Sequence, residues 1–319
     1  MRILFISSTR IGDAVLSTGL LGHLIERFPE ARITIACGPL PSRIFARAPH
    51  VERVITLYKR PLAGHWRGLW ANVAGTVWDL VVDLRGSALS WTLRAKKRRV
   101  FRRADDVLHR VEALARLLDL DEPPAPRIWW SEAEDDLAAN HIGDGTPVLA
   151  LGPTANWPAK IWPADRFVDL ATRITARDGP LPEARIAVFG GPDERDLAMP
   201  ILQAIPPQRC IDLVGAVDLL TVAACIKRCD LFVGNDSGLM HLAAATGTPT
   251  LGLFGPSQAV HYAPWGAHCA VAETDISFAD LVGAADFDHR TSGTLMTSLS
   301  VDRVLTAARE LRRRTQAVP

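Results

Sequence analysis

The residues best suited to chemistry lie in one polar stretch that follows an apolar run at 231–233. In order, they are Gly234, Asn235, Asp236, Ser237, Gly238 and, three positions later, His241. The pattern predicts a buried strand, a short loop and the first turn of a helix, whose free N–H groups suit an anion such as a diphosphate. Gly238 would let the backbone approach closely, and Ser237 would add a hydroxyl donor. The alternative makes Asp236 or Ser237 a helix cap and His241 a surface residue, but the combination favours a ligand site.

Two more loops should lie at the same edge of the sheet, because parallel strands present their carboxyl ends together. The predicted strand at 250–254 ends in a small-residue loop that contains Ser257, and the strand at 148–151 runs into a loop with Asn156 and Lys160. A lysine between two prolines is often merely solvated. Here Lys160 is a candidate to neutralise the charge on a diphosphate leaving group, a role that needs no metal.

The first half of the chain offers one candidate base. Asp13 follows the predicted strand at 2–7 and stands at the head of a helix expected over 13–28. It could be a helix cap or a general base that takes a proton from an incoming hydroxyl. Only Gly12 is present where a dinucleotide fingerprint would need several glycines, which weakens an NAD-dependent interpretation.

Residues 94–103 form a dense basic run in a chain whose formal net charge is +1. The cations named here as candidate acceptor contacts are Arg98, Arg99, Arg102 and Arg103. Such a cluster indicates an anionic partner, either a phosphorylated acceptor or the negative inner face of a membrane. A solvated helix end is the alternative. The run lacks interleaved aromatic residues, and the whole chain is almost neutral. Both observations argue against a nucleic acid as the binding partner.

The elements that would position these residues alternate between strands and helices, which predicts parallel sheets covered on both faces. A Pro-rich, then acidic stretch at 121–145 interrupts the alternation. We therefore predict an N-terminal, acceptor-binding domain over 1–140 and a C-terminal, donor-binding domain over 141–319. The final helix, expected over 301–314, could brace the first domain. No structure is predicted for 269–298.

The composition fits this view. The chain has 319 residues and 48% hydrophobic residues, enough for two cores. Its five cysteines show no CxxC spacing, so reduced, packed thiols are expected and no metal site. No signal segment or membrane-spanning run is apparent, which predicts a cytoplasmic protein that could work at the cytoplasmic face of the inner membrane.

Several of these stretches, taken in order, resemble the heptosyltransferases of glycosyltransferase family 9. The resemblance rests on residues 10–13 (Arg-Ile-Gly-Asp), 160–163 (Lys-Ile-Trp-Pro), 234–241, 247–249 and 255–257. It implies the α/β GT-B fold, two Rossmann-like domains facing a central cleft. It implies Asp13 as catalytic base with Arg10 beside it at the acceptor, and Lys160 at the donor phosphates. The remaining donor contacts would be Asn156, Asp236, Ser237, Gly238, Met240, His241 and Ser257.

The function that follows is an inverting, metal-independent glycosyltransferase without a cofactor, acting in lipopolysaccharide core biosynthesis as a peripheral membrane protein. The donor implied by the resemblance is ADP-heptose, and the acceptor a lipid-linked anionic saccharide. Two other classes stay open at this point: an NAD-dependent oxidoreductase and a non-catalytic nucleotide-sugar-binding module. Intact Asp13 and Lys160 argue against the second of these.

Overall fold

The computed structural model describes residues 1–102, 107–283, 288 and 291–316, and the chain divides into two compact units, residues 1–130 and 131–319. The predicted domain boundary at 140 falls inside helix α6 (Glu132–Ile142). This helix packs against α9 (Leu219–Lys227) of the second unit and buries Ala138 and Ile142. The acidic segment therefore belongs to the fold of the second unit and is not a linker.

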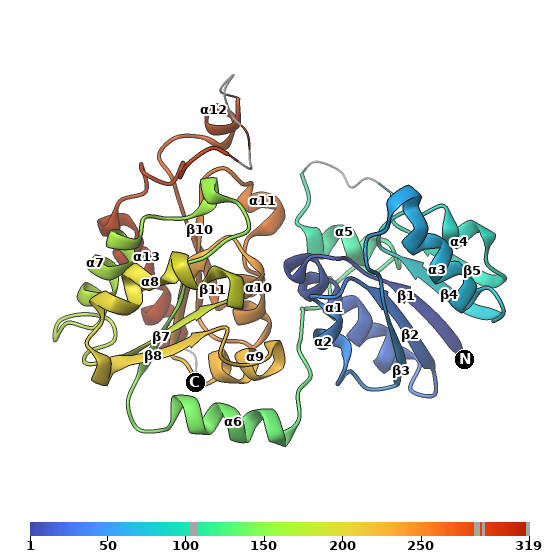
Figure 1. The fold of residues 1–319 in the computed structure, drawn as a ribbon, viewed down its shortest axis with the longest axis horizontal. Coiled ribbons are helices and arrows are strands. Elements are labelled where there is room, and N and C mark those ends of the chain that lie inside the picture. Colours follow the sequence, from blue (N-terminus) through green and yellow to red (C-terminus); the bar gives the residue numbers. More distant parts are fainter. Residues whose placement is uncertain (103–106, 284–287, 289–290, 317–319) are drawn as a thin grey trace. The chain divides into compact units, whose positions relative to one another are not determined.

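The first unit is built on a five-stranded parallel sheet of order β3-β2-β1-β4-β5 (Figure 1). Its strands are β1 (Arg2–Ile6), β2 (Arg32–Cys37), β3 (Val51–Thr56), β4 (Trp78–Asp83) and β5 (Ala95–Val100). Its helices are α1 (Ile11–Arg27), α2 (Ser42–Phe45), η1 (Pro61–Ala63), α3 (Gly64–Val73), α4 (Leu89–Thr92) and α5 (Arg110–Arg116). The central strands are almost wholly buried, as expected when helices cover both faces of a parallel sheet.

The second unit holds a six-stranded parallel sheet of order β11-β10-β9-β6-β7-β8. Its strands are β6 (Val148–Gly152), β7 (Arg185–Gly190), β8 (Cys210–Val214), β9 (Leu231–Asn235), β10 (Thr250–Phe254) and β11 (Cys269–Glu273). Besides α6 and α9, its helices are η2 (Pro158–Lys160), α7 (Ala164–Ile174), η3 (Pro192–Glu194), α8 (Arg195–Ala204), η4 (Pro207–Arg209), α10 (Gly238–Ala245), α11 (Ala259–Tyr262), α12 (Phe278–Val282) and α13 (Val301–Gln316). The strands predicted from the sequence are confirmed here, and both units have the Rossmann-like alternation.

The core of the second unit reaches from the sheet to the last helix. Trp162 is fully buried, meets Phe167 edge to face at 5.0 Å and donates its indole N–H to the carbonyl of Leu299. α13 packs against α7, β10 and β11, with Val304 and Leu311 in the same core. The apolar face of the final helix is thus used within the second unit, whereas the sequence left open that this helix could brace the first domain.

Candidate functional site

In the second unit, the polar residues gather at the point where the strand order reverses. β6 is flanked by β7 on one side and by β9 on the other, so the loops after β6 and β9 leave the sheet next to each other. In open parallel sheets, such a switch point opens a crevice outside the carboxyl ends of the strands, and ligands bind there. The loop after β6 carries Lys160, and the loop after β9 carries Asp236 and Ser237.

Asn235, to which no role was assigned from the sequence, ties these two loops together. Its side chain is fully buried at the end of β9. Its amide donates to the carbonyl of Pro153 at 2.8 Å and its oxygen accepts from the backbone N–H of Trp162 at 3.1 Å. Both ends of the loop that carries Lys160 are therefore fixed to β9. The signal that could have revealed this residue is an amide at the very end of an apolar strand.

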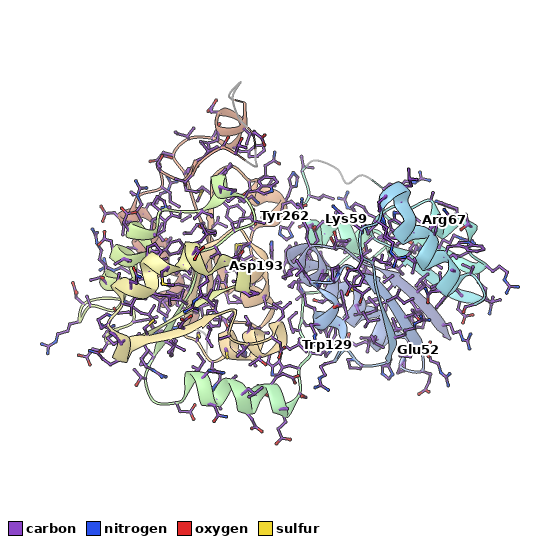
Figure 2. The ribbon with its side chains drawn as sticks, in the orientation of Figure 1. Glu52, Lys59, Arg67, Trp129, Asp193 and Tyr262 are labelled. Carbon is purple, nitrogen blue, oxygen red and sulfur yellow. The ribbon has the colours of Figure 1, made fainter. Side chains whose placement is uncertain are left out.

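Lys160 and Asp236 form a close ion pair at this edge. The Nζ atom of Lys160 lies 2.5 Å from Oδ2 of Asp236, and the two side chains are only 14% and 7% exposed. The ammonium also lies 4.7 Å from the centre of the Trp157 ring, within range of a cation–π contact. His241 lies beside the carboxylate, with Nε2 3.9 Å from Oδ1 of Asp236, and its ring centre is 6.4 Å from that of Tyr262, which Figure 2 labels. The structure thus brings three predicted donor residues together.

Two hydroxyls close to this cluster are unpaired. α10 begins at Gly238 with Ser237 at its N-cap, yet the Ser237 hydroxyl makes no capping bond. Its Oγ atom and that of Ser257, in the loop after β10, are buried and have no hydrogen-bond partner in the described part of the chain. A buried polar atom without a partner costs free energy, commonly about 1–3 kcal/mol. Such atoms, one at the N-cap of α10 and one in the loop after the neighbouring strand β10, can be satisfied by the oxygens of a bound anion.

Two other predicted donor residues differ in their surroundings. Asn156 is exposed on the loop after β6. Met240 is fully buried on α10, and a Cβ added at Gly252 of β10 would lie only 2.5 Å from its sulfur. We therefore interpret Met240 as a packing residue that fixes α10 on the sheet, which does not support the expected contact with a nucleotide.

In the first unit, Asp13 lies in the first turn of α1, immediately after β1. The N-cap of α1 is Arg10, so Asp13 is the third residue of the helix and not its cap. Its carboxylate accepts one long hydrogen bond, from the Ser8 hydroxyl at 3.3 Å, while Ser8 in turn accepts from the backbone N–H of Arg10. The cap interpretation is thus removed, and Asp13 keeps lone pairs for another donor. Arg10 itself is exposed.

A second carboxylate at the same sheet edge provides an internal contrast. Asp83 ends β4, the neighbour of β1, and is fully buried. It accepts from the backbone N–H groups of Arg85 and Ser87, at 2.9 and 2.8 Å, and from the hydroxyls of Ser87 and Ser90, both at 2.5 Å. These four bonds occupy the carboxylate and hold the loop after β4. Asp83 is structural, whereas Asp13 is available as a base.

The basic run takes a form that the sequence analysis did not foresee. Residues 95–100 are the edge strand β5, so successive side chains point to opposite faces and do not form one patch. Arg98 donates to the backbone carbonyls of Ser90, Leu93 and Ala95, which uses its guanidinium within the fold. Arg99 pairs with Asp119 at 2.7 Å, and Arg102 is exposed. The predicted contact Arg103 lies outside the described residues.

The cysteine thiols are packed inside the fold or partly covered by it. Cys225 and Cys229 are buried, and burial raises the pKa of the Cys37, Cys225 and Cys269 thiols to about 12. In the described part of the chain, no three His, Cys, Asp or Glu side chains are grouped to hold a metal ion. No helix among the described residues is long and apolar enough to cross a bilayer.

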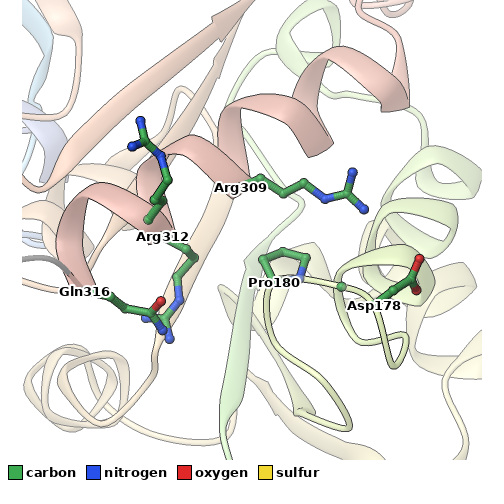
Figure 3. A pocket seen from close by; sticks show the side chains of 7 residues that line it. Asp178, Pro180, Arg309, Arg312 and Gln316 are labelled. Carbon is green, nitrogen blue, oxygen red and sulfur yellow. The ribbon is translucent and has the colours of Figure 1, made fainter.

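A cavity of about 460 Å³ lies elsewhere, between α13 and the loop that follows α7 (Figure 3). Arg309, Arg312 and Gln316 line one side of it, and Asp178 and Pro180 the other. None of the predicted site residues lines this cavity, so we do not place the candidate site in it.

Comparison with known proteins places the chain in a family. Residues 63–280 match glycosyltransferase family 9 (heptosyltransferase). This range includes Lys160 and the stretch from Asp236 to Ser257, but begins after Asp13. Lipopolysaccharide heptosyltransferase 2 of Salmonella typhimurium is 25% identical over 300 residues, which cover 81% of this chain and 84% of that protein.

Solved structures agree with the fold. The structure of the E. coli ADP-heptose lipopolysaccharide heptosyltransferase II has a TM-score of 0.76 at 23% identity and covers 99% of this chain and 100% of that one. A glycosyl transferase family 9 protein from Veillonella parvula reaches a TM-score of 0.79 at 22% identity, with 98% and 97% covered. The predicted GT-B fold class is confirmed.

Proposed function

The chain belongs to glycosyltransferase family 9, the heptosyltransferases, and from this premise we propose that it transfers a heptose from ADP-heptose to a hydroxyl of a lipopolysaccharide core. Membership in this family makes it a glycosyltransferase and removes the oxidoreductase alternative. The donor and acceptor are taken from the names of its relatives. Its own residues support the assignment of roles.

The second unit holds the donor in this proposal. The diphosphate would lie against the N-terminus of α10 and accept hydrogen bonds from the hydroxyls of Ser237 and Ser257. The ammonium of Lys160, which is paired with Asp236, would also donate a hydrogen bond to the diphosphate. Burial strengthens each charge-assisted bond because little water screens it. The observation that carries the proposal is that the loops at this edge of the sheet hold an almost buried lysine and the unpaired, buried hydroxyls of Ser237 and Ser257.

The first unit supplies the base. As the acceptor oxygen attacks the anomeric carbon, the carboxylate of Asp13 takes the hydroxyl proton, and the bond from that carbon to the phosphate oxygen breaks. Attack on the face opposite the leaving group inverts the anomeric centre. The developing charge on ADP is met by Lys160 and by the N–H groups at the start of α10. Every charge in this scheme is met by a protein group, so no metal ion is required.

The test is an assay with ADP-heptose and a lipid-linked core saccharide, in the presence of EDTA. We expect release of ADP and a gain of one heptose in the acceptor, seen by mass spectrometry, at a rate that EDTA does not change. UDP-glucose serves as the control donor and should give far less product. Loss of activity in EDTA, or equal use of both donors, would overturn the proposal.

A further inference from the structure

The segment from Arg53 to Trp78 has an unusual composition. Between Glu52 and Asp79 the sequence contains no acidic residue, although it holds Arg53, Lys59, Arg60 and Arg67. Aromatic residues are interleaved with these cations: Tyr58, Trp66, Trp70 and Trp78. In a chain of almost zero net charge, such a stretch concentrates positive charge and large apolar side chains in one place.

The structure turns part of this stretch outward. Residues 58–63 are all exposed, and they lead from the carboxyl end of β3 into η1 and α3. The side chain of Leu62 is 97% exposed, that of Tyr58 61% and that of Trp70 49%. Exposed single apolar residues are common, but a leucine and two aromatics on one short segment form a recognisable surface.

α3 is held firmly under this surface. Leu69 and Val73 are buried in the first unit's core, and Trp66 packs against the same core with the Arg85 guanidinium 5.1 Å above its ring. Because the inner face of α3 is fixed in this way, Arg67 and Trp70 are left on its outer face, one turn apart. Figure 2 labels Lys59 before α3 and Arg67 on it.

The backbone at the tip is strained. Leu62 and Ala63 have φ of 49° and 55°, in the left-handed region that favours glycine. Such a conformation costs on the order of 1 kcal/mol for a residue with a bulky side chain. The Leu62 side chain is 97% exposed, so no burial of it offsets that cost.

Among the described residues of the second unit, no comparable surface is found. Its large exposed hydrophobic residues, among those described, are Leu137, Leu197, Val260 and Ile276, all aliphatic and far apart in sequence. Exposed Tyr and Trp beside Lys and Arg, with a protruding leucine, suit the boundary between headgroups and acyl chains of a bilayer that carries negative lipids.

We propose that the surface formed by Tyr58, Lys59, Arg60, Leu62, Arg67 and Trp70 docks the protein on an anionic lipid bilayer. Leu62 and Trp70 would enter the acyl boundary while the three cations meet the phosphate headgroups. The surface begins at the carboxyl edge of the first unit's sheet, the edge that carries Asp13. Docking there would bring a lipid-linked acceptor to the base, and this consequence alone rests on the proposed function.

The experiment is flotation with vesicles of phosphatidylcholine and phosphatidylglycerol in a ratio of about 2:1, with pure phosphatidylcholine as control and no donor or acceptor present. We expect binding to the mixed vesicles only, weakening as salt is raised. Replacing Lys59, Arg60 and Arg67 by Ser should lower the partition coefficient on the order of a hundredfold, since each cation contributes about fivefold. The pair Leu62→Asp and Trp70→Ala should lower it at least about tenfold.

Matched controls come from two other surfaces. Lys96→Ser with Arg99→Ser removes two cations of β5, and Leu197→Asp removes an exposed leucine of the second unit; both should bind as the parent does. Leu62→Asp should fold, because Asp tolerates a left-handed φ better than Leu. On a water-soluble, delipidated acceptor, the Leu62→Asp and Trp70→Ala variant should keep its rate.

The outcomes separate the two proposals. No binding of the parent to anionic vesicles, undiminished binding of the Leu62 and Trp70 variant, or release by the β5 variant in its place would each overturn the docking surface. None of these results bears on heptose transfer, because the vesicles contain no substrate. Failure of the transfer assay, conversely, leaves the vesicle result unchanged.

Discussion

The two units are built on the same kind of parallel sheet, but the polar side chains at the carboxyl edges of the two sheets differ in how they are paired. At the carboxyl edge of the second unit, polar side chains are interlocked: Asn235 bridges two loops, and Lys160 and Asp236 are paired and almost buried. At the corresponding edge of the first unit, Asp83 is saturated but Asp13 accepts one long bond only. A rigid, paired cluster suits binding of one fixed anion, whereas an underused carboxylate suits proton transfer.

The largest effect that this comparison predicts concerns the two carboxylates of the first unit. Asp13→Asn keeps the shape but removes the proton acceptor, so kcat should fall by roughly 10²- to 10⁴-fold without loss of stability. Asp83→Asn removes a carboxylate that accepts four hydrogen bonds in the interior, so the free energy of unfolding should fall by about 2–4 kcal/mol. Steady-state kinetics of both variants measures kcat, and thermal unfolding measures their stability. Equal behaviour of the two variants would refute the distinction.

Next in size is the effect of Lys160→Ala. Loss of one charge-assisted bond to the diphosphate, worth about 1.5–3 kcal/mol, should weaken ADP binding by roughly 10- to 100-fold. The rate should fall as well, since the same cation meets the leaving group. Calorimetric titration with ADP measures the affinity. Lys227→Ala, at the C-terminal end of α9, removes a cation of the same unit and should leave affinity and rate unchanged.

A smaller effect separates two neighbours in β5. Arg98→Ala removes donors to three backbone carbonyls and should lower the free energy of unfolding by about 1–2 kcal/mol. Arg99→Ala breaks an exposed pair with Asp119, which should cost less than about 1 kcal/mol. Urea denaturation of both variants tests the contrast. If Arg99→Ala instead raises the KM for the acceptor, Arg99 keeps its predicted contact with the acceptor. Arg98 cannot make such a contact while its guanidinium donates to the three carbonyls.

The last prediction concerns the reaction rates of the thiols and bears least on the comparison of the two units. Because burial raises the pKa of Cys37, Cys225 and Cys269 to about 12, these thiols carry almost no thiolate at pH 8, and folded protein should react slowly with a disulfide reagent. Cys210 is less deeply buried and should react first, although burial raises its pKa too. In denaturant all five should react at once. Fast native labelling of Cys225 would contradict the packing of α9.

The sequence was most informative where burial is strongest. Strands such as β1, β6 and β9 are continuous apolar runs that end in polar loops, and the residues proposed for the site were chosen from these loops. β5 was missed because it is an edge strand with charged residues, whose pattern carries no apolar alternation. β11 and α12 were missed in 269–298 because β11 is also an edge strand and only partly buried.

Partners in space escaped prediction for a different reason. The roles of Asn235 and Asp83 depend on which loops the sheet order places side by side, and a single sequence does not give that order. The start of α1 was also predicted wrongly: the helix was expected to begin at Asp13, but it begins two residues earlier, at Ile11. Helix starts are sensitive to such local competition.

The central claim is that the second unit holds the nucleotide while the first supplies the base. The most direct test is the dissociation constant for ADP, measured by calorimetry without metal on the parent, Asp13→Asn and Lys160→Ala. We expect Asp13→Asn to bind ADP within about twofold of the parent while its kcat falls by roughly two orders of magnitude or more. Lys160→Ala should bind ADP about tenfold or more weakly than the parent. An Asp13→Asn variant that turns over like the parent, or a Lys160→Ala variant with the parent's affinity, would contradict this division of roles.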